Sequence, residues 1–432
     1  MEKPVIRISV RNLVEFILRN GDLESGGTAG DKEAMLKGSR LHRKIQKQMG
    51  SHYQAEVSLK KDTEYEDLIL RVEGRADGIF TQNEKICIDE IKGVYKNLEL
   101  LAEPVLVHRA QALCYAWIYL DDHGLEEIDV QMTYVHLDTE MIKRFRETMT
   151  REELESWYQR LLDSYHKWLS YQMKWREERN RSMEKLEFPF IYRKGQKEMV
   201  AGIYHAISRK EQIFIQAPTG VGKTMSAVFP AVRSIGEGKA ETLFYLTART
   251  ITRTVAQDAF EILRKNGLLF KTVTITAKEK LCFCEKPECN PETCPYAKGH
   301  YDRINDAVYE LWTNEQSFDR ETILRQAEKW QVCPFEMSLD LSVWMDAVIC
   351  DYNYVFDPQA HLRRFFGEGN KGDYLFLIDE AHNLVERGRQ MYSASICKED
   401  FLGIKKKVRY EDEKLTERLE DCNRGLLAMK RE

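Results

Sequence analysis

The sequence predicts an α/β protein in which a parallel sheet covered by helices forms the larger part. Between residues 188 and 380, apolar runs of strand length alternate with stretches that suit helices. Within this region Gln216–Thr224 (Gln-Ala-Pro-Thr-Gly-Val-Gly-Lys-Thr) follows the apolar run Ile213–Ile215, a predicted strand, and precedes a predicted helix. A second apolar run, Tyr374–Ile378, ends in the tetrapeptide Asp379–His382. The alternation and these two strand ends together indicate the α/β class.

The stretch from Gln216 to Thr224 has the composition of a loop that binds phosphate groups. Its backbone N–H groups and the following helix N-terminus can surround the phosphates, while Lys223 reaches the β and γ oxygens and Thr224 ligates Mg²⁺. Ala217 stands where the strict pattern has its first glycine. The loop residues that we expect to bind ATP are Thr219, Gly220, Val221, Gly222, Lys223 and Thr224.

The acidic end of the strand Tyr374–Ile378 predicts the second half of an ATP site. Asp379 would hold the Mg²⁺ that accompanies ATP, and Glu380 would orient the attacking water. Both halves occur in the order expected of such a site, each after an apolar run. The sequence therefore predicts an ATP hydrolase that requires Mg²⁺.

The bulk properties of the chain limit its class. Its 432 residues suffice for two to four domains. The net charge of −5 gives no global basic field, so a site for a polyanion must be a local patch. No run of 18 apolar residues is present, and Met1–Pro4 lacks the apolar core of a signal peptide. We therefore expect a cytoplasmic protein without a membrane partner.

Four segments are expected along the chain. Residues 150–187 have the pattern of one long polar helix connecting two domains, with an aromatic stripe that we expect to pack on a neighbour. Residues 188–385 form the α/β domain, and residues 386–432 are charged and helical, with 399–432 expected to be poorly ordered. Residues 1–149 mix predicted helices at 9–19, 34–49 and 109–120 with predicted strands at 53–59, 68–72, 85–91 and 130–137.

Five of the ten cysteines fall between Cys282 and Cys333, which favours a metal site over disulfides in a cytosolic chain. The spacing is irregular and lacks the C-x-x-C pairs that are usual in zinc ribbons. Four thiolates from irregular loops suit a [4Fe–4S] cluster. On spacing alone, a zinc site and unligated cysteines stay open as alternatives.

The order of phosphate loop, cysteine insertion and Asp-Glu-Ala-His resembles the XPD/DinG group of iron–sulfur superfamily 2 DNA helicases. The matching stretches cover about residues 188–385, with the insertion at about 276–345. They include Cys294-Pro295-Tyr296, Cys333-Pro334-Phe335 and Val348–Pro358. The resemblance implies a RecA-like ATPase domain that binds single-stranded or forked DNA and moves 5′ to 3′. It also accounts for Ala217, because these helicases do not require the first glycine.

The same resemblance assigns roles to single residues. It implies cluster ligands at Cys282, Cys289, Cys294 and Cys333, and it leaves Cys284 as the surplus cysteine. Gln196, together with Arg193, occupies the place of a nucleotide-recognition segment, and Thr242–Thr254 resembles the strand and loop that touch the DNA backbone.

A second constellation lies in the N-terminal part. Residues two apart in a strand share a face, so Glu90 and Lys92 should point the same way and Asp89 the opposite way. With Asp77 from an adjacent turn, they could bind a divalent metal and position a water for phosphodiester hydrolysis. On these residues alone, a solvated strand face with a salt bridge is the alternative.

The surroundings of this constellation, about residues 5–140, resemble the RecB-type branch of the PD-(D/E)XK nucleases. Gly38–His42 matches its G-x-x-x-H motif, and Glu90 stands where the branch usually has Asp. The resemblance implies a restriction-endonuclease-like fold that cleaves DNA with Mg²⁺ or Mn²⁺. The implied site consists of His42, Asp77 and Glu90 as metal ligands, Asp77, Glu90 and Lys92 in catalysis, and Gln111 and Tyr115 in support.

The sequence thus predicts a nuclease–helicase of DNA repair or processing, with a second RecA-like domain expected but absent from these residues. Two other functions stay open: an ATP-gated DNA-binding module with a silent nuclease fold, and a zinc-stabilised ATPase acting on a non-DNA target. A purely structural scaffold explains neither the phosphate loop nor the cysteines. The sequence specifies no oligomeric state, pathway or preferred DNA structure.

Overall fold

The structure is a computed structural model, and it describes residues 3–24, 32–218, 220–248, 250–285, 288–367 and 369–429. The chain divides into two compact units, each described by itself below. The first comprises Met1–Tyr245, Arg253–Cys350 and Asp373–Leu377. The second comprises Leu246–Thr252, Asp351–Gly372 and Ile378–Glu432.

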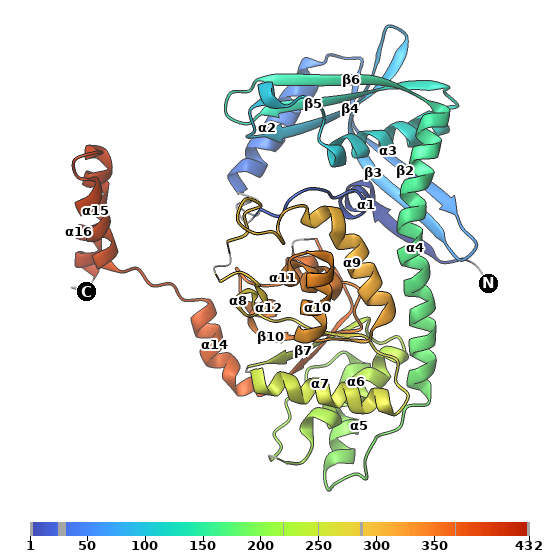
Figure 1. Ribbon diagram of the computed structural model, residues 1–432, viewed down its shortest axis with the longest axis vertical. Coiled ribbons are helices and arrows are strands. Elements are labelled where there is room, and N and C mark those ends of the chain that lie inside the picture. Colours follow the sequence, from blue (N-terminus) through green and yellow to red (C-terminus); the bar gives the residue numbers. More distant parts are fainter. Residues whose placement is uncertain are drawn as a thin grey trace. The chain divides into compact units, whose positions relative to one another are not determined.

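The N-terminal part of the first unit is built on a six-stranded sheet (Figure 1). The sheet order is β1-β3-β4-β5-β6, and β2 also pairs with β3. The pairs β1–β3 and β4–β5 are parallel, whereas β2–β3, β3–β4 and β5–β6 are antiparallel. The strands are β1 (Val5–Ser9), β2 (Tyr53–Glu64), β3 (Ile69–Gln82), β4 (Lys85–Val94), β5 (Glu127–His136) and β6 (Ile142–Thr150).

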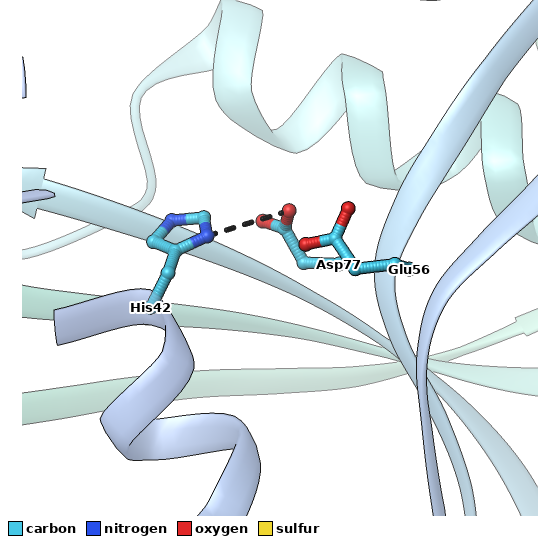
Figure 2. A group of neighbouring side chains, drawn as sticks. All are labelled: His42, Glu56 and Asp77. Carbon is cyan, nitrogen blue, oxygen red and sulfur yellow. Dashed lines mark ion pairs between the residues drawn. The ribbon is translucent and has the colours of Figure 1, made fainter. Parts of the chain in front are cut away.

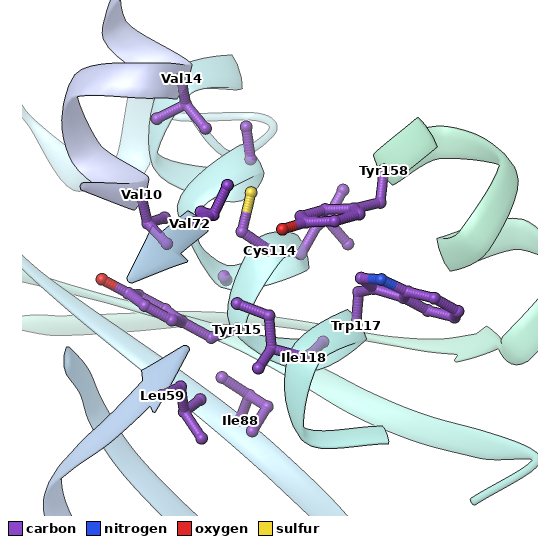
Figure 3. Close-up of a cluster of buried hydrophobic side chains, with 14 of the residues drawn as sticks. Val10, Val14, Leu59, Val72, Ile88, Cys114, Tyr115, Trp117, Ile118 and Tyr158 are labelled. Carbon is purple, nitrogen blue, oxygen red and sulfur yellow. The ribbon is translucent and has the colours of Figure 1, made fainter. Parts of the chain in front are cut away.

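Helices cover this sheet and bury its apolar residues. Helix α3 (Leu106–His123) contributes ten buried residues, because small and apolar side chains occur all round it. Side chains of α1 (Val10–Ile17), of α3 and of the sheet form one core, which includes Val10, Val14, Val72, Ile88 and Ile118 (Figure 3). Helix α2 (Lys32–Gln48) packs separately, with Leu41 and Ile45 against Ile91 of β4. The 3₁₀ turn η1 (Leu98–Leu100) precedes α3.

The predicted long helix is present as α4 (Arg151–Glu184), which begins at a capping box of Thr150 and Glu153. Its aromatic stripe packs on neighbours, as expected. Tyr158 joins the N-terminal core, Trp168 stacks on Trp312 with ring centroids 5.7 Å apart, and Trp175 donates a hydrogen bond to Asp346 at 2.9 Å.

The second sheet has the order β11-β7-β10-β8-β9, with parallel pairing of β10 to β8 and of β8 to β9. Its strands are β7 (Thr242–Thr247), β8 (Thr272–Thr274), β9 (Ser317–Phe318), β10 (Ala347–Asp351) and β11 (Tyr374–Ile378). Val228 and Val232 of α6 (Lys223–Gly236) and Phe260 of α7 (Thr250–Lys265) pack on this sheet. Helix α5 (Gln196–Arg209) precedes α6.

The prediction of a strand at Ile213–Ile215 is wrong. The backbone from Glu211 to Pro218 has no regular structure, and Phe214 is 87% exposed. No described strand of the second sheet pairs with this stretch, so it lacks the ladder hydrogen bonds that would define a strand. The α/β class nevertheless holds, since both sheets are flanked by helices.

The cysteine insertion is mostly helical. It contains α8 (Lys278–Leu281), α9 (His300–Asn314), α10 (Arg320–Trp330) and α11 (Pro334–Ser342), with irregular chain between α8 and α9. Four of the five cysteines lie in that irregular chain, and the fifth, Cys333, is the N-cap of α11.

The second unit contains short and mostly exposed helices: α12 (Asn353–Phe356), α13 (Arg363–Phe366), the 3₁₀ turn η2 (Ala381–Asn383), α14 (Leu384–Met391), α15 (Lys398–Val408) and α16 (Glu413–Met429). The prediction of charged helices near the end is confirmed. Helices α15 and α16 pack on one another, with Lys405 and Glu420 paired at 3.1 Å, and neither contributes a buried residue. Among the described helices, none has both the length and the apolar character needed to cross a bilayer.

Candidate functional sites

Three side chains from three elements of the N-terminal part converge on one point (Figure 2). His42 comes from α2, Glu56 from β2 and Asp77 from β3, and one ligand atom of each lies within 4.8 Å of the other two. Asp77 lies within a strand rather than in the predicted turn. An imidazole and two carboxylates are a donor set that suits a divalent cation.

Two of these side chains are held by the same residue. Ile91 accepts a hydrogen bond from His42 Nε2 at 2.6 Å through its carbonyl, and its N–H donates to Asp77 Oδ2 at 2.7 Å. Because a carbonyl only accepts, Nε2 carries the proton, and Nδ1 of the neutral ring keeps its lone pair. Nδ1 lies 3.6 Å from Asp77 Oδ1, so both point toward the shared centre.

Close approach of α2 to β4 brings His42 to this position. A Cβ added at Gly93 would lie 3.7 Å from the Cα of Gly38 and 2.6 Å from Leu137. It is therefore Gly93 of β4 that needs the absence of a side chain, beside Leu137 and the α2 backbone at Gly38, and His42 follows Gly38 one turn later on the same face of α2.

Glu56 is the residue of this cluster that the sequence patterns did not identify. It lies within β2 opposite Asp77, yet its φ is +58°, in the left-handed region that residues other than Gly, Asn and Asp seldom adopt. Gln46 donates to Glu56 at 3.1 Å and to the Asp77 carbonyl at 3.0 Å, which joins the two strands to α2. In an alternating strand a glutamate reads as a solvent-facing residue, so no sequence signal marked it.

Glu90 and Lys92 lie on the same face of β4, as the alternation predicts. Their side chains pair at 2.8 Å, and Lys92 donates to Gln111 of α3 at 2.6 Å. The Glu90 side chain is only 5% exposed, and its second oxygen has no hydrogen-bond partner among the described residues. Tyr115, one turn after Gln111, is buried in the adjacent core. Glu90 therefore has a buried carboxylate oxygen without a hydrogen-bond partner among the described residues, and it is not one of the three residues whose ligand atoms converge within 4.8 Å.

Burial raises the pKa of both acidic residues of the motif. Desolvation is the larger cause for Asp77 and for Glu90, and the negative charge of Asp77 raises the pKa of Glu90 further. A cation bound near them would favour the ionised form of both carboxyl groups and so lower their pKa values. The chemistry of the donor set thus fits Mg²⁺ or Mn²⁺.

Asp89 belongs to a different network on the opposite face of β4. It accepts hydrogen bonds from Tyr53 at 3.1 Å, Gln131 at 3.1 Å and Thr133 at 2.6 Å, and all four side chains are buried. The carboxylate that directly precedes Glu90 in the sequence is therefore structural.

The phosphate loop is braced from the N-terminus of α5. The buried Gln196 donates to the Val221 carbonyl at 2.6 Å, and Arg193 donates to the Gly220 carbonyl. Gly222 has φ +78° and caps α6, and an added Cβ there would lie 2.6 Å from the Gln196 amide nitrogen. Lys223 and Thr224 are half-buried in the first turn of α6. Thr219 lies outside the described residues.

The acidic strand end is held within the second unit. The Asp379 N–H donates to the Leu246 carbonyl at 2.9 Å, and the Tyr352 hydroxyl donates to the carbonyls of Asp379 and Glu380. Glu380 has φ +51°, and its carboxylate lies 3.4 Å from His382 Nδ1. The backbone of this turn is thus held by Leu246 and Tyr352.

All five clustered cysteines line a single cavity, together with Leu23, Lys278 and Tyr296. The ten cysteines of the chain are free thiols. Cys284 Sγ lies 3.8 Å from Cys294 Sγ, and burial followed by this contact raises the pKa of Cys284 to about 11. Cys284, which was expected to be surplus, therefore lies among the other thiols of this cavity. Convergent soft donors without a disulfide fit an iron–sulfur cluster.

Residues 193–288 match the family model described as DEAD/DEAH box helicase, and residues 266–401 match the DEAD_2 model. Together the two matches contain the phosphate loop, the five cysteines and the acidic strand end. This region of the chain is thus similar to DEAD/DEAH box helicase sequences.

Two curated relatives are similar to part of the chain. Regulator of telomere elongation helicase 1 homolog of Caenorhabditis briggsae is 24% identical over 247 residues, which cover 47% of this chain and 24% of the relative. Fanconi anemia group J protein homolog of Gallus gallus is 31% identical over 106 residues, which cover 24% of this chain and 8% of the relative. The chain thus spans about a quarter, or less, of these relatives' length.

Among solved structures, XPD_Helicase is 17% identical with a TM-score of 0.36, over 54% of this chain and 40% of that chain. A score this low carries no argument about the fold.

Proposed function

We propose that residues 193–401 contain the ATP-binding motor of a 5′-to-3′ DNA helicase, and that the preceding domain is a metal-dependent DNA nuclease. The observation that carries the motor is the pair of overlapping helicase matches, which contain both halves of the predicted ATP site in order. The bracing of the loop by Gln196 and Arg193 supports the assignment, because it fixes two carbonyls away from the space that phosphates would occupy. Single-stranded or forked DNA would be the partner.

In the nuclease, His42, Glu56, Asp77 and Glu90 would hold Mg²⁺ or Mn²⁺. The cation would lower the pKa of a bound water and polarise the scissile phosphate. Lys92, held by Glu90 and Gln111, would then offset negative charge that develops on the phosphate. The hydrogen bond from His42 Nε2–H to the Ile91 carbonyl would leave Nδ1 to ligate the cation.

In the insertion, Cys282, Cys289, Cys294 and Cys333 would hold a [4Fe–4S] cluster, with Cys284 competing with Cys289 for one position. The cluster would stabilise a segment whose cysteines lie mostly in irregular chain. Anaerobic purification tests this directly, through absorbance near 400 nm and about four irons per chain. If the purified chain contains zinc and no iron, the cysteines form a zinc site and not an iron–sulfur cluster.

The motor and the nuclease are tested with the full chain and labelled DNA. A lower affinity for ATP in Lys223→Ala would support the motor assignment. DNA cleavage that requires Mg²⁺ or Mn²⁺ and is lost in Asp77→Ala would support the nuclease assignment. If the chain binds DNA but does not cleave it at any metal concentration, the N-terminal domain is a catalytically silent nuclease fold that only binds DNA. If Lys223→Ala binds ATP with wild-type affinity, the assignment of the ATP-binding motor is wrong.

A further inference from the structure

A short segment after α1 lies directly against the cysteine insertion. We call Arg19–Leu23 the strap. Its backbone pairs with the turn that leads into α9, where Leu23 N–H donates to the Ala297 carbonyl at 2.8 Å and Tyr301 N–H donates to the Gly21 carbonyl at 2.9 Å. Two carboxylates complete the pairing, since Gly21 N–H donates to Asp302 at 2.8 Å and Gly299 N–H donates to Asp22 at 2.6 Å.

Arg19 fixes the other end of the strap. It pairs with Asp340 of α11 at 2.7 Å, with the two side chains 19% and 9% exposed, and donates twice to Asn305 of α9 at 2.9 and 2.6 Å. Asn305 in turn donates to the Phe16 carbonyl at 2.7 Å. Charge-assisted bonds with this little exposure hold a segment far better than exposed pairs do.

Leu23 forms part of the wall of the thiol cavity. Its side chain is 7% exposed, packs with Cys294 and Ala297, and is one of the residues lining the cavity. Cys284 and Cys333 pack around the same cluster. An apolar wall beside sulfur ligands excludes water and so controls access to whatever the sulfurs hold.

The strap continues directly from the N-terminal core, where Val10, Leu13 and Val14 of α1 are fully buried. We propose that the strap is the closing wall of the metal centre and that it couples the centre to the N-terminal domain. A metal on the thiols holds the strap, and loss of the metal releases it. This inference rests on the proposed metal centre, and linkage requires that the coupling act in both directions.

The first test measures metal release from the full chain, purified without oxygen, into excess chelator. Leu23→Ala opens the wall and should speed release by about tenfold or more, because a buried Leu→Ala change removes apolar contacts and leaves a cavity. Leu23→Met refills the wall and should restore a rate near that of the wild type. Asn20→Ala changes an exposed strap residue and is the matched control.

The second test needs no variant. Amide hydrogen exchange of residues 19–23 should quicken after the metal is stripped, while exchange of the buried α3 segment stays unchanged. Equal release rates for Leu23→Ala and the wild type, or unchanged exchange in the strap, would overturn the coupling and leave the metal centre intact. A wild-type chain that holds neither iron nor zinc would overturn the centre and the coupling together.

Discussion

The two predicted catalytic regions differ in how completely the chain holds them. At the N-terminal site, hydrogen bonds of Gln46 and Ile91 connect α2, β2, β3 and β4, and Glu90 and Lys92 pair within β4. At the phosphate loop, two carbonyls are braced from α5, while the stretch that leads into the loop is irregular and exposed.

The difference shows where each site obtains its order. The N-terminal site is formed by contacts within one sheet and its covering helices, so its order comes from the fold itself. The phosphate loop presents backbone donors at a helix N-terminus, and its ordering would come in part from the phosphates themselves. Substitutions should therefore act on chemistry at the first site and on ligand affinity at the second.

The largest effect is expected at the buried carboxylate of the N-terminal site. Glu90→Gln keeps the shape but removes the charge that faces the cation, so metal-dependent cleavage should fall by at least about 10³-fold, as for residues that act as a unit. Cleavage of labelled single-stranded DNA by the full chain measures this. Affinity for ATP should stay at the wild-type value.

Asp89→Asn is the matched control, since it changes the neighbouring carboxylate on the opposite strand face. Cleavage should persist, whereas the free energy of unfolding should fall by about 1–3 kcal/mol because the hydrogen bonds from Tyr53, Gln131 and Thr133 are weakened. Equal loss of cleavage in both variants would refute the separation of the two faces.

At the phosphate loop, the expected loss is in affinity. Lys223→Ala removes the charge that offsets the phosphates and should weaken ATP binding by about 10²-fold or more. Gln196→Ala leaves that charge but removes the brace on Val221, and a smaller loss of about tenfold is expected, consistent with one hydrogen bond. Titration with a fluorescent ATP analogue distinguishes the two. A larger effect in Gln196→Ala than in Lys223→Ala would show that the brace, and not the lysine, organises the loop.

How far the sequence predicted these sites depended on whether a residue's role follows from local spacing. The alternation placed Glu90 and Lys92 together and Asp89 apart, and the glycine pattern placed Gly222 at the start of α6. The run Ile213–Ile215 had strand composition, but a strand also needs a partner in a sheet, which composition does not specify. Glu56 was missed for a related reason, because its role depends on a backbone angle and on residues distant in sequence.

The raised pKa values of Asp77 and Glu90 predict how pH acts on the metal-free protein. A carboxyl group whose pKa is higher in the folded chain stabilises the fold below its unfolded pKa and loses that contribution as pH rises through the folded pKa. The metal-free chain should therefore lose a few degrees in Tm between pH 4.5 and 7.5, and Mn²⁺ should restore them at the upper pH. In Glu90→Gln both the loss and the rescue should shrink. A wild-type Tm for which Mn²⁺ makes no difference at pH 7.5 would argue against a cation at these carboxylates.

The smallest effect is expected at Glu56, where substitution by Gly should raise both the free energy of unfolding and the metal concentration that cleavage requires. Its left-handed backbone costs free energy that a glycine would not incur, so Glu56→Gly should raise the free energy of unfolding by about 1 kcal/mol in the metal-free chain. The same change removes a carboxylate from the cluster with His42 and Asp77, so the Mn²⁺ concentration needed for half-maximal cleavage should rise. Glu56→Gln separates the two effects, because it keeps the strain and loses the charge: it should need more Mn²⁺ without gaining stability. If Glu56→Gly is stabilised and cleaves DNA at the wild-type Mn²⁺ concentration, the strain at Glu56 serves no metal, and the cation would be held by His42, Asp77 and Glu90 alone.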